Sequence, residues 1–111
     1  MKSSFYDVKS GDWEKLPGQK RKIIHMDNLT VMAIRVDKGT VTDAGHSHPH
    51  EQAAVVLSGK IKFFIADETR ILGPGDGYLV KPNLKHHIEA LEDTVLIDYF
   101  SPRRSDLKAT E

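Results

Sequence analysis

Histidine is concentrated in two short parts of the chain, and its spacing there is typical of a metal site. The clusters comprise five of the six histidines: His46, His48 and His50, then His86 and His87. Residues two apart on a β-strand point to the same side, so the imidazoles of His46 and His48 can converge on one point. A histidine on a strand can also simply face solvent, but the second cluster favours the interpretation that these histidines bind a common metal ion.

Two further side chains complete a candidate ligand set. Gln52 lies four residues after His48, across a turn that would return its amide oxygen to the same point. His86 would arrive from a separate junction between a turn and a strand. Three imidazole nitrogens and one amide oxygen suit a first-row divalent ion such as Ni, Fe, Mn, Co or Zn. His50 and Glu51, between the ligands, are expected to face solvent or to support the site.

A single carboxylate interrupts an apolar run near the end of the chain. In residues 94–100, Leu96, Asp98 and Phe100 alternate and would share one face of a strand. If that face lines the interior, Asp98 is an ionisable group in an apolar pocket and a candidate for acid–base chemistry. The alternative is an edge-strand aspartate that faces water.

Short apolar runs separated by turn residues indicate the elements that must position these side chains. Such a rhythm predicts an all-β sandwich or barrel. Ser58-Gly59-Lys60 is a hairpin signal, and residues 73–77 form a dense turn cluster. The expected strands are 29–36, a second near 39–41, 53–57, 61–66, 70–72, 78–80, 86–91 and 94–100. Any helix should be short and terminal, around residues 11–16 or after Pro102.

Length and composition limit the classes of protein to consider. The 111 residues form one domain, with an arm over about 1–28, a barrel over about 29–100 and a tail over about 101–111. Sixteen basic and sixteen acidic residues leave no strongly basic field, which argues against nucleic acid or an anionic membrane as partner. Without cysteine, disulfides and thiolate sites are excluded. The polar N-terminus does not look like a signal peptide, so we expect a cytoplasmic protein.

Two segments resemble the sequence motifs of the cupin family. Residues 45–52, followed by Gly59, resemble the first motif, with two histidines, a Glu or Gln, and a glycine seven residues later. Residues 75–86 resemble the second, whose ligand histidine falls on His86. Counting from the displaced Pro82 would select His87 instead; the register from Gly75 favours His86. The resemblance implies a double-stranded β-helix, or jelly-roll barrel, with one divalent metal held by His46, His48, Gln52 and His86.

Glutamine at position 52 has a chemical consequence, because many cupins have a glutamate there. A divalent ion held by three neutral imidazoles and Gln52 keeps its full charge of +2. Such a site should bind metal less tightly and act as a stronger Lewis acid toward an anionic ligand. Two open positions of a six-coordinate ion would accept a carboxylate oxygen and a neighbouring oxygen of a small organic acid.

Residues 13–107 resemble a subgroup of small cupins, the pectin-degradation proteins of the KdgF type. The shared features are Trp13, Pro17-Gly18, the string at 46–52, Val-Leu-Ser-Gly at 56–59, and the ending from Asp98 to Asp106. This resemblance implies an enzyme that opens cyclic 4,5-unsaturated monouronates, released by pectin or alginate lyases, to linear keto acids.

The same resemblance implies roles for individual residues and an assembly. Asp98 would move protons, Phe100 would pack against the sugar, and Arg104 would clamp the carboxylate, with Arg103 as the alternative clamp. It also implies a homodimer. Two other functions fit the motifs: a different metal-dependent cupin enzyme, a dioxygenase or an isomerase acting on a small organic acid, and a non-catalytic cupin that binds a small ligand.

Overall fold

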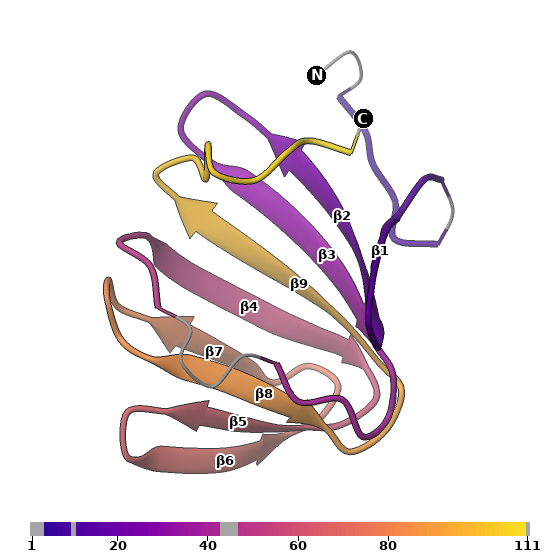
Figure 1. The fold of residues 1–111 in the computed structure, drawn as a ribbon, viewed down its shortest axis with the longest axis vertical. Coiled ribbons are helices and arrows are strands. Elements are labelled where there is room, and N and C mark those ends of the chain that lie inside the picture. Colours follow the sequence, from indigo (N-terminus) through magenta and orange to yellow (C-terminus); the bar gives the residue numbers. More distant parts are fainter. Residues whose placement is uncertain (1–3, 10, 43–46, 111) are drawn as a thin grey trace.

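The computed structural model describes residues 4–9, 11–42 and 47–110, which form nine β-strands and no helix. The strands are β1 (Glu14–Leu16), β2 (Gln19–His25), β3 (Thr30–Val36), β4 (Glu51–Ser58), β5 (Ile61–Ile65), β6 (Glu68–Leu72), β7 (Gly77–Val80), β8 (His86–Ala90) and β9 (Thr94–Ser101). They make two antiparallel sheets, of order β1-β2-β3-β9-β4-β7 and β6-β5-β8 (Figure 1). No helix in this part is long and apolar enough to cross a membrane.

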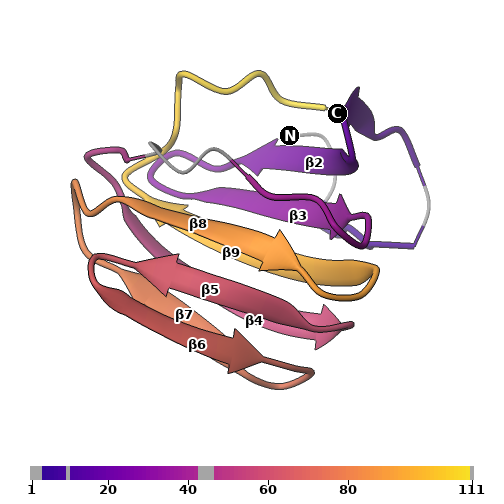
Figure 2. The ribbon, with the colours of Figure 1, turned by 60° about the horizontal axis from the view of Figure 1, so that its bottom comes forward.

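The two sheets face each other across one hydrophobic core. Side chains from both contribute to it, including Ile23 and Leu96 from the large sheet and Ile61 from the small one, all fully buried. The small sheet lies over the β9–β4–β7 part of the large sheet, and β2 and β3 extend beyond it (Figure 2). In the described part of the chain, this overhang leaves an open side of the interior between β2 and β8, where a cavity is lined by residues of both strands, among them Arg21 and His86. The predicted all-β architecture is confirmed.

Strand register determines which polar side chains enter the core. On β9, Leu96, Asp98 and Phe100 are buried in the interior, whereas Ile97 and Tyr99 alternate with them on the outer face, where Ile97 is also buried and Tyr99 is half-buried. Asp98 lies opposite Ala54 of β4, and Phe100 lies opposite Gln52. Gln52 and Asp98 therefore project from neighbouring strands into the same interior, because one face of a pleated sheet takes every second residue.

The N-terminal part differs from the sequence-based expectation. Residues 19–25 form β2, which was not predicted, and residues 14–16, expected to end a short helix, pair with it as β1. Residues 19–25 include three basic side chains, so the sequence of β2 looks polar. The alternation of a strand nevertheless places Ile23 in the interior. The stem of Lys22 packs near the ring of Trp13, with Nζ 5.5 Å from its centroid. Long basic side chains can cover apolar surface in this way, which a simple polarity pattern misses.

Smaller differences concern the edges of other elements. The strand expected near 39–41 is reduced to a single bridge between Val41 and Glu89. The connection between the strands expected at 61–66 and 70–72 is tighter, because Ala66 has a φ of 51° and β6 already starts at Glu68. From residue 103 to residue 110 the chain makes turns and no helix.

The C-terminal tail crosses back over β3 to β2 (Figure 1). At its far end Thr110 donates its N–H to the carbonyl of Ile23 at 3.0 Å, and its hydroxyl accepts the N–H of Ile23 at 2.9 Å. Nearer β9, the backbone N–H of Arg104 donates to the hydroxyl of Thr30 at 2.9 Å. These bonds hold the tail over the open side of the interior, where it delivers the Arg104 side chain.

Candidate functional site

The predicted site residues surround one cavity of about 250 Å³ at the open side of the sandwich. Its polar lining includes Arg21, Gln52, Tyr78, His86, Asp98 and Arg104, set among apolar core residues. His48 stands beside it, with ring centroids 5.0 Å from His86 and 5.4 Å from Phe100. His46, the remaining predicted ligand, lies outside the described residues.

The two buried imidazoles are held in one tautomer by backbone carbonyls. Nδ1 of His86 lies 2.8 Å from the carbonyl oxygen of Leu84, and Nδ1 of His48 lies 3.0 Å from that of His50. A proton on Nδ1 leaves the lone pair of the neutral ring on Nε2. Burial lowers the pKa of both His48 and His86 below the usual histidine value. Both rings are therefore neutral near pH 7, as metal ligation requires.

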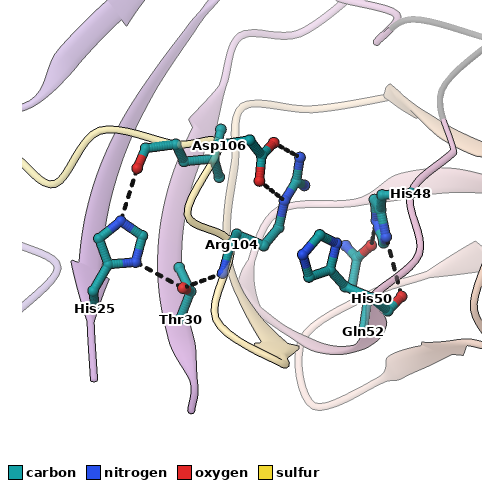
Figure 3. A network of polar contacts seen from close by, with 8 residues as sticks. His25, Thr30, His48, His50, Gln52, Arg104 and Asp106 are labelled. Carbon is teal, nitrogen blue, oxygen red and sulfur yellow. Dashed lines mark hydrogen bonds and ion pairs between the residues drawn. The ribbon is translucent and has the colours of Figure 1, made fainter. Parts of the chain in front are cut away.

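A chain of polar contacts links His48 through Gln52 to Asp98. Nε2 of His48 lies 2.8 Å from Oε1 of Gln52, and Nε2 of Gln52 donates to Oδ1 of Asp98 at 2.6 Å. A neutral imidazole has one proton, yet both nitrogens of His48 face oxygen acceptors (Figure 3). Turning the Gln52 amide over would instead place its oxygen against the Asp98 carboxylate. The contact between His48 and Gln52 becomes favourable when Nε2 is protonated as well or when a cation lies between the two side chains.

These donors fit a divalent cation. Two ligand atoms at about 2.1 Å from one metal ion lie roughly 3 Å apart when they are adjacent in its coordination shell. The 2.8 Å between His48 Nε2 and Gln52 Oε1 agrees with that spacing. Across residues 4–9, 11–42 and 47–110, no three His, Cys, Asp or Glu side chains are gathered around one point. The fit therefore rests on His48, His86 and the Gln52 amide.

Asp98 is the buried acid of the cavity, with 1% of its surface exposed. Its Oδ1 accepts hydrogen bonds from Gln52 and from the hydroxyl of Tyr78, the latter at 2.8 Å. Burial raises the pKa of Asp98 to about 6, although these hydrogen bonds and the charge of Arg104 act in the opposite direction. Burial and the neighbouring Asp98 carboxylate hold the pKa of Tyr78 well above its usual value. Of the two positions that the sequence allowed for Asp98, the interior and a water-facing edge strand, the structure has the interior.

Arg104 reaches the cavity, and Arg103 does not. The guanidinium carbon of Arg104 lies 4.8 Å from the ring centroid of Phe100. Its Nε and Nη2 both donate to the carboxylate of Asp106, at 3.3 and 2.6 Å, and this lowers the pKa of Asp106 (Figure 3). Arg103 is exposed and directs Nη1 to the carbonyl of Met26 at 3.4 Å.

The adjacent histidines of the second cluster have different environments. His86 is 5% exposed and lies beside His48. His87 also borders the cavity, but its ring stacks on that of Phe64, with centroids 4.2 Å apart and planes within 5°. His50 supports the site through its carbonyl, which accepts from His48; its own Nδ1 is buried and has no hydrogen-bond partner among the described residues.

Sequence reasoning missed Tyr78 and gave no role to His25. Tyr78 and Asp98 both lie opposite Ala54, on either side of β4, so the pairing of β4 with β7 and β9 brings them together. His25 connects Thr30, 2.8 Å from its Nδ1, to the tail carbonyl of Leu107, 2.8 Å from its Nε2 (Figure 3). The Tyr78–Asp98 and His25–Leu107 contacts have no local signal, because each joins segments far apart in the sequence.

The chain is similar to known proteins over nearly its whole length. The cupin domain model matches residues 32–99. A pectin degradation protein KdgF of Dickeya dadantii (strain 3937) is 40% identical over 110 residues, which cover 96% of this chain and 98% of that protein.

Two solved structures have the same architecture. KdgF from a Halomonas species superimposes with a TM-score of 0.86 and 36% identity, covering 93% of this chain and 98% of that one. An RmlC-like cupin from Shewanella frigidimarina NCIMB 400 gives a TM-score of 0.86 with 28% identity, covering 94% and 95%. With two facing antiparallel sheets and both sequence motifs in place, the chain belongs to the cupin family, as a relative of the KdgF proteins.

Proposed function

We propose that this protein is a metal-dependent enzyme that converts cyclic 4,5-unsaturated monouronates to linear keto acids. The observation that carries the proposal is a fully buried carboxylate, Asp98, hydrogen-bonded to Gln52 beside the histidine cluster. The 40% identity to a protein of pectin degradation supports the choice of substrate class. A cavity of about 250 Å³ with arginine in its wall is suited to a small sugar acid.

The proposed ligands of the divalent ion are His46, His48, Gln52 and His86. Bound there, the ion would act as a Lewis acid toward the carboxylate and ring oxygen of the sugar. Gln52 has two roles in this arrangement. Its oxygen faces His48, and its nitrogen holds Asp98 by the 2.6 Å hydrogen bond, so the acid has a fixed position relative to the ligands.

Asp98 serves as the proton carrier of the proposed reaction. It accepts the proton of the anomeric hydroxyl while the carbonyl forms at C1 and the bond between C1 and the ring oxygen breaks. The electron pair passes to the ring oxygen as an enolate, and the same carboxyl returns the proton to C4, leaving a ketone at C5. The reaction is an isomerisation, with no net gain or loss of protons. A pKa of about 6 suits a group that must both accept and donate near neutral pH.

Arg104 and Phe100 orient the sugar acid. Asp106 holds two donors of the Arg104 guanidinium and so fixes its plane against Phe100, leaving Nη1 for the ligand. A fixed guanidinium loses little conformational entropy when it binds a carboxylate oxygen. Phe100 is 1% exposed and forms the apolar floor beneath it.

Proton NMR of a lyase-generated unsaturated monouronate tests the proposal, because ring opening has an uncatalysed background that must be subtracted. Wild type should remove the ring signals faster than buffer, and Asp98→Ala should lose at least 100-fold of that enhancement. Arg103→Ala is the matched control, because Arg103 lies outside the cavity, and it should retain wild-type rates. Decay in wild type no faster than in buffer refutes the activity, and equal decay in Asp98→Ala refutes the role of Asp98.

We also propose that the protein forms a homodimer through the outer face of the large sheet. An apolar row crosses five strands there and ends at Leu79, which is 80% exposed. The N-terminal segment covers the β2 end of this face, where Val8 packs against Ile24 and Val31. The β4–β7 end, with Ala53 and Leu79, is not covered by the N-terminal segment. We propose that a second copy packs there, because a contiguous exposed apolar patch is typical of a protein–protein interface.

A further inference from the structure

A second arginine, Arg21, enters the same cavity from β2. It lies opposite Ile34 of β3, in a row that continues through Leu96 to Val56. The other three members are at most 8% exposed and belong to the core. Because one row of an antiparallel sheet points to one side, Arg21 projects inward, and it borders the cavity together with Asp98 and Arg104.

The donors of the two arginines are used differently. Arg104 gives both Nε and Nη2 to Asp106. Arg21 gives only Nε, to Oε1 of Glu14 on the neighbouring β1, at 2.6 Å. Within the described part of the chain, no hydrogen bond is formed by Nη1 or Nη2 of Arg21. The Glu14 contact thus orients the guanidinium while its outer edge stays available to a ligand in the cavity.

The ion pair with Glu14 makes the free N–H groups of Arg21 better suited to neutral oxygen acceptors than to a second carboxylate. Glu14 already balances Arg21, and the two side chains are about one-quarter to one-third exposed. Arg104, a proposed acid-binding group, is held at Thr30, which pairs with His25 of β2, four residues along that strand from Arg21. A ligand whose carboxylate is bound there would present its hydroxyl and carbonyl oxygens toward Arg21. Gln19, two residues before Arg21, also lines this end.

We propose that Arg21, assisted by Gln19, binds the hydroxyl or carbonyl oxygens of a small sugar acid at the end remote from its carboxylate. The inference deepens the proposed function and rests on it for the orientation of the ligand. It makes the β1–β2 hairpin a wall of the site that favours sugar acids over short hydroxy acids, which would reach only the carboxylate-binding end.

Calorimetric titration with two acids tests this assignment on protein of measured metal content. Galacturonate is a sugar acid without the reactive double bond, and glycolate is a two-carbon hydroxy acid. Arg21→Gln should weaken galacturonate binding roughly tenfold, as expected for one hydrogen bond to a charged donor, and leave glycolate binding unchanged. Arg21→Lys keeps the positive charge but loses the planar guanidinium, and its affinity for galacturonate should lie between those of wild type and Arg21→Gln. Lys20→Gln, on the outer face of the same strand, should match wild type.

The outcomes separate this inference from the proposed reaction. An unchanged galacturonate affinity in Arg21→Gln, an equal loss for both acids, or no binding of galacturonate by wild type overturns the role of Arg21. If wild type does not turn over the unsaturated monouronate, but Arg21→Gln selectively loses galacturonate, the binding role stands and the proposed reaction falls. If wild type turns over the unsaturated monouronate with the same KM as Arg21→Gln, the reaction stands and the role of Arg21 falls.

Discussion

At the scale of the residue, Asp98 shows how burial prepares a carboxyl group for chemistry at a cost in stability. An ordinary aspartate is ionised at neutral pH in both the folded and the unfolded chain. Burial raises the pKa of Asp98 from 3.8 to about 6 in the folded protein, so the folded form binds the proton more tightly. The resulting penalty is absent below the unfolded pKa, grows between about pH 4 and 6, and is complete above pH 6.

Asp98→Asn should therefore stabilise the metal-free protein at neutral pH. Asparagine keeps an oxygen that accepts from Gln52 and Tyr78 but removes the buried charge. A shift of this size corresponds to about 2 to 3 kcal/mol at pH 7.5 and almost none at pH 4. Thermal unfolding with a chelator should show a gap between the variant and wild type that widens with rising pH. Asp12→Asn, at an exposed site, serves as control, and a gap that is constant with pH contradicts this account.

Gln52 is the residue that separates metal affinity from acid–base function. Gln52→Glu adds a negative charge to the proposed ligand set and should raise the affinity for a divalent ion at least tenfold, measured by competition with a chelator. It also replaces the donor to Asp98 by a second carboxylate, which raises the pKa of the pair, so turnover should fall. Glu51→Gln, at the exposed neighbouring position, should change neither quantity. Unchanged metal affinity in Gln52→Glu would remove Gln52 from the ligand set.

At the scale of the element, the tail is fixed to the sheet by a few polar bonds. His25 at the end of β2 bonds both Thr30 and the tail carbonyl of Leu107, and Thr30 accepts the backbone N–H of Arg104. Thr30 is fully buried, so this small network has no water to replace a lost partner. The position of Arg104 over Phe100 therefore depends on an imidazole that is remote from the cavity.

His25→Ala should loosen the tail without disturbing the metal ligands. Amide hydrogen exchange at Arg104 and Leu107 should become faster, and the KM for the uronate should rise while metal content stays the same. Met26→Ala, at an exposed neighbouring position, provides the comparison. Unchanged exchange at both tail amides would show that His25 does not hold this segment.

The elements also show where sequence patterns succeed. The strands that carry the two cupin motifs were predicted to within a few residues, because alternating apolar residues and strong turn signals mark them: β4 was expected at 53–57 and spans Glu51–Ser58. β2 was missed, since its pattern depends on Lys22 packing against Trp13 at a distance in the chain. The alternation of Asp98 with Leu96 and Phe100 predicted that the three share one face, but it left open whether that face is the interior, where the structure places all three.

At the scale of the whole molecule, the site is assembled by topology, which no local pattern contains. Asp98 and Tyr78 meet because β9 and β7 flank β4, and Arg104 reaches the cavity because the tail returns over β3. The sequence identified Asp98 and Arg104 through a family resemblance. Tyr78 and Arg21 required the arrangement of the sheets, because their partners lie in other strands.

The proposed homodimer gives a prediction at the same scale. Leu79→Lys places a charge at the exposed end of the apolar row and should convert a dimer into a monomer in analytical ultracentrifugation. Ile71→Lys is a matched control, because Ile71 is 58% exposed but lies on the small sheet. A monomeric wild type, or a dimer unaffected by Leu79→Lys, contradicts the proposed interface.

The central claim is that one cation lies among the buried imidazoles and the Gln52 amide, next to Asp98. Anomalous diffraction from a crystal grown with a divalent transition metal tests it most directly. We expect a single strong peak about 2.0 to 2.2 Å from Nε2 of His48, Nε2 of His86 and Oε1 of Gln52. A peak bound elsewhere, or an interior without one when metal is in excess, would contradict the account.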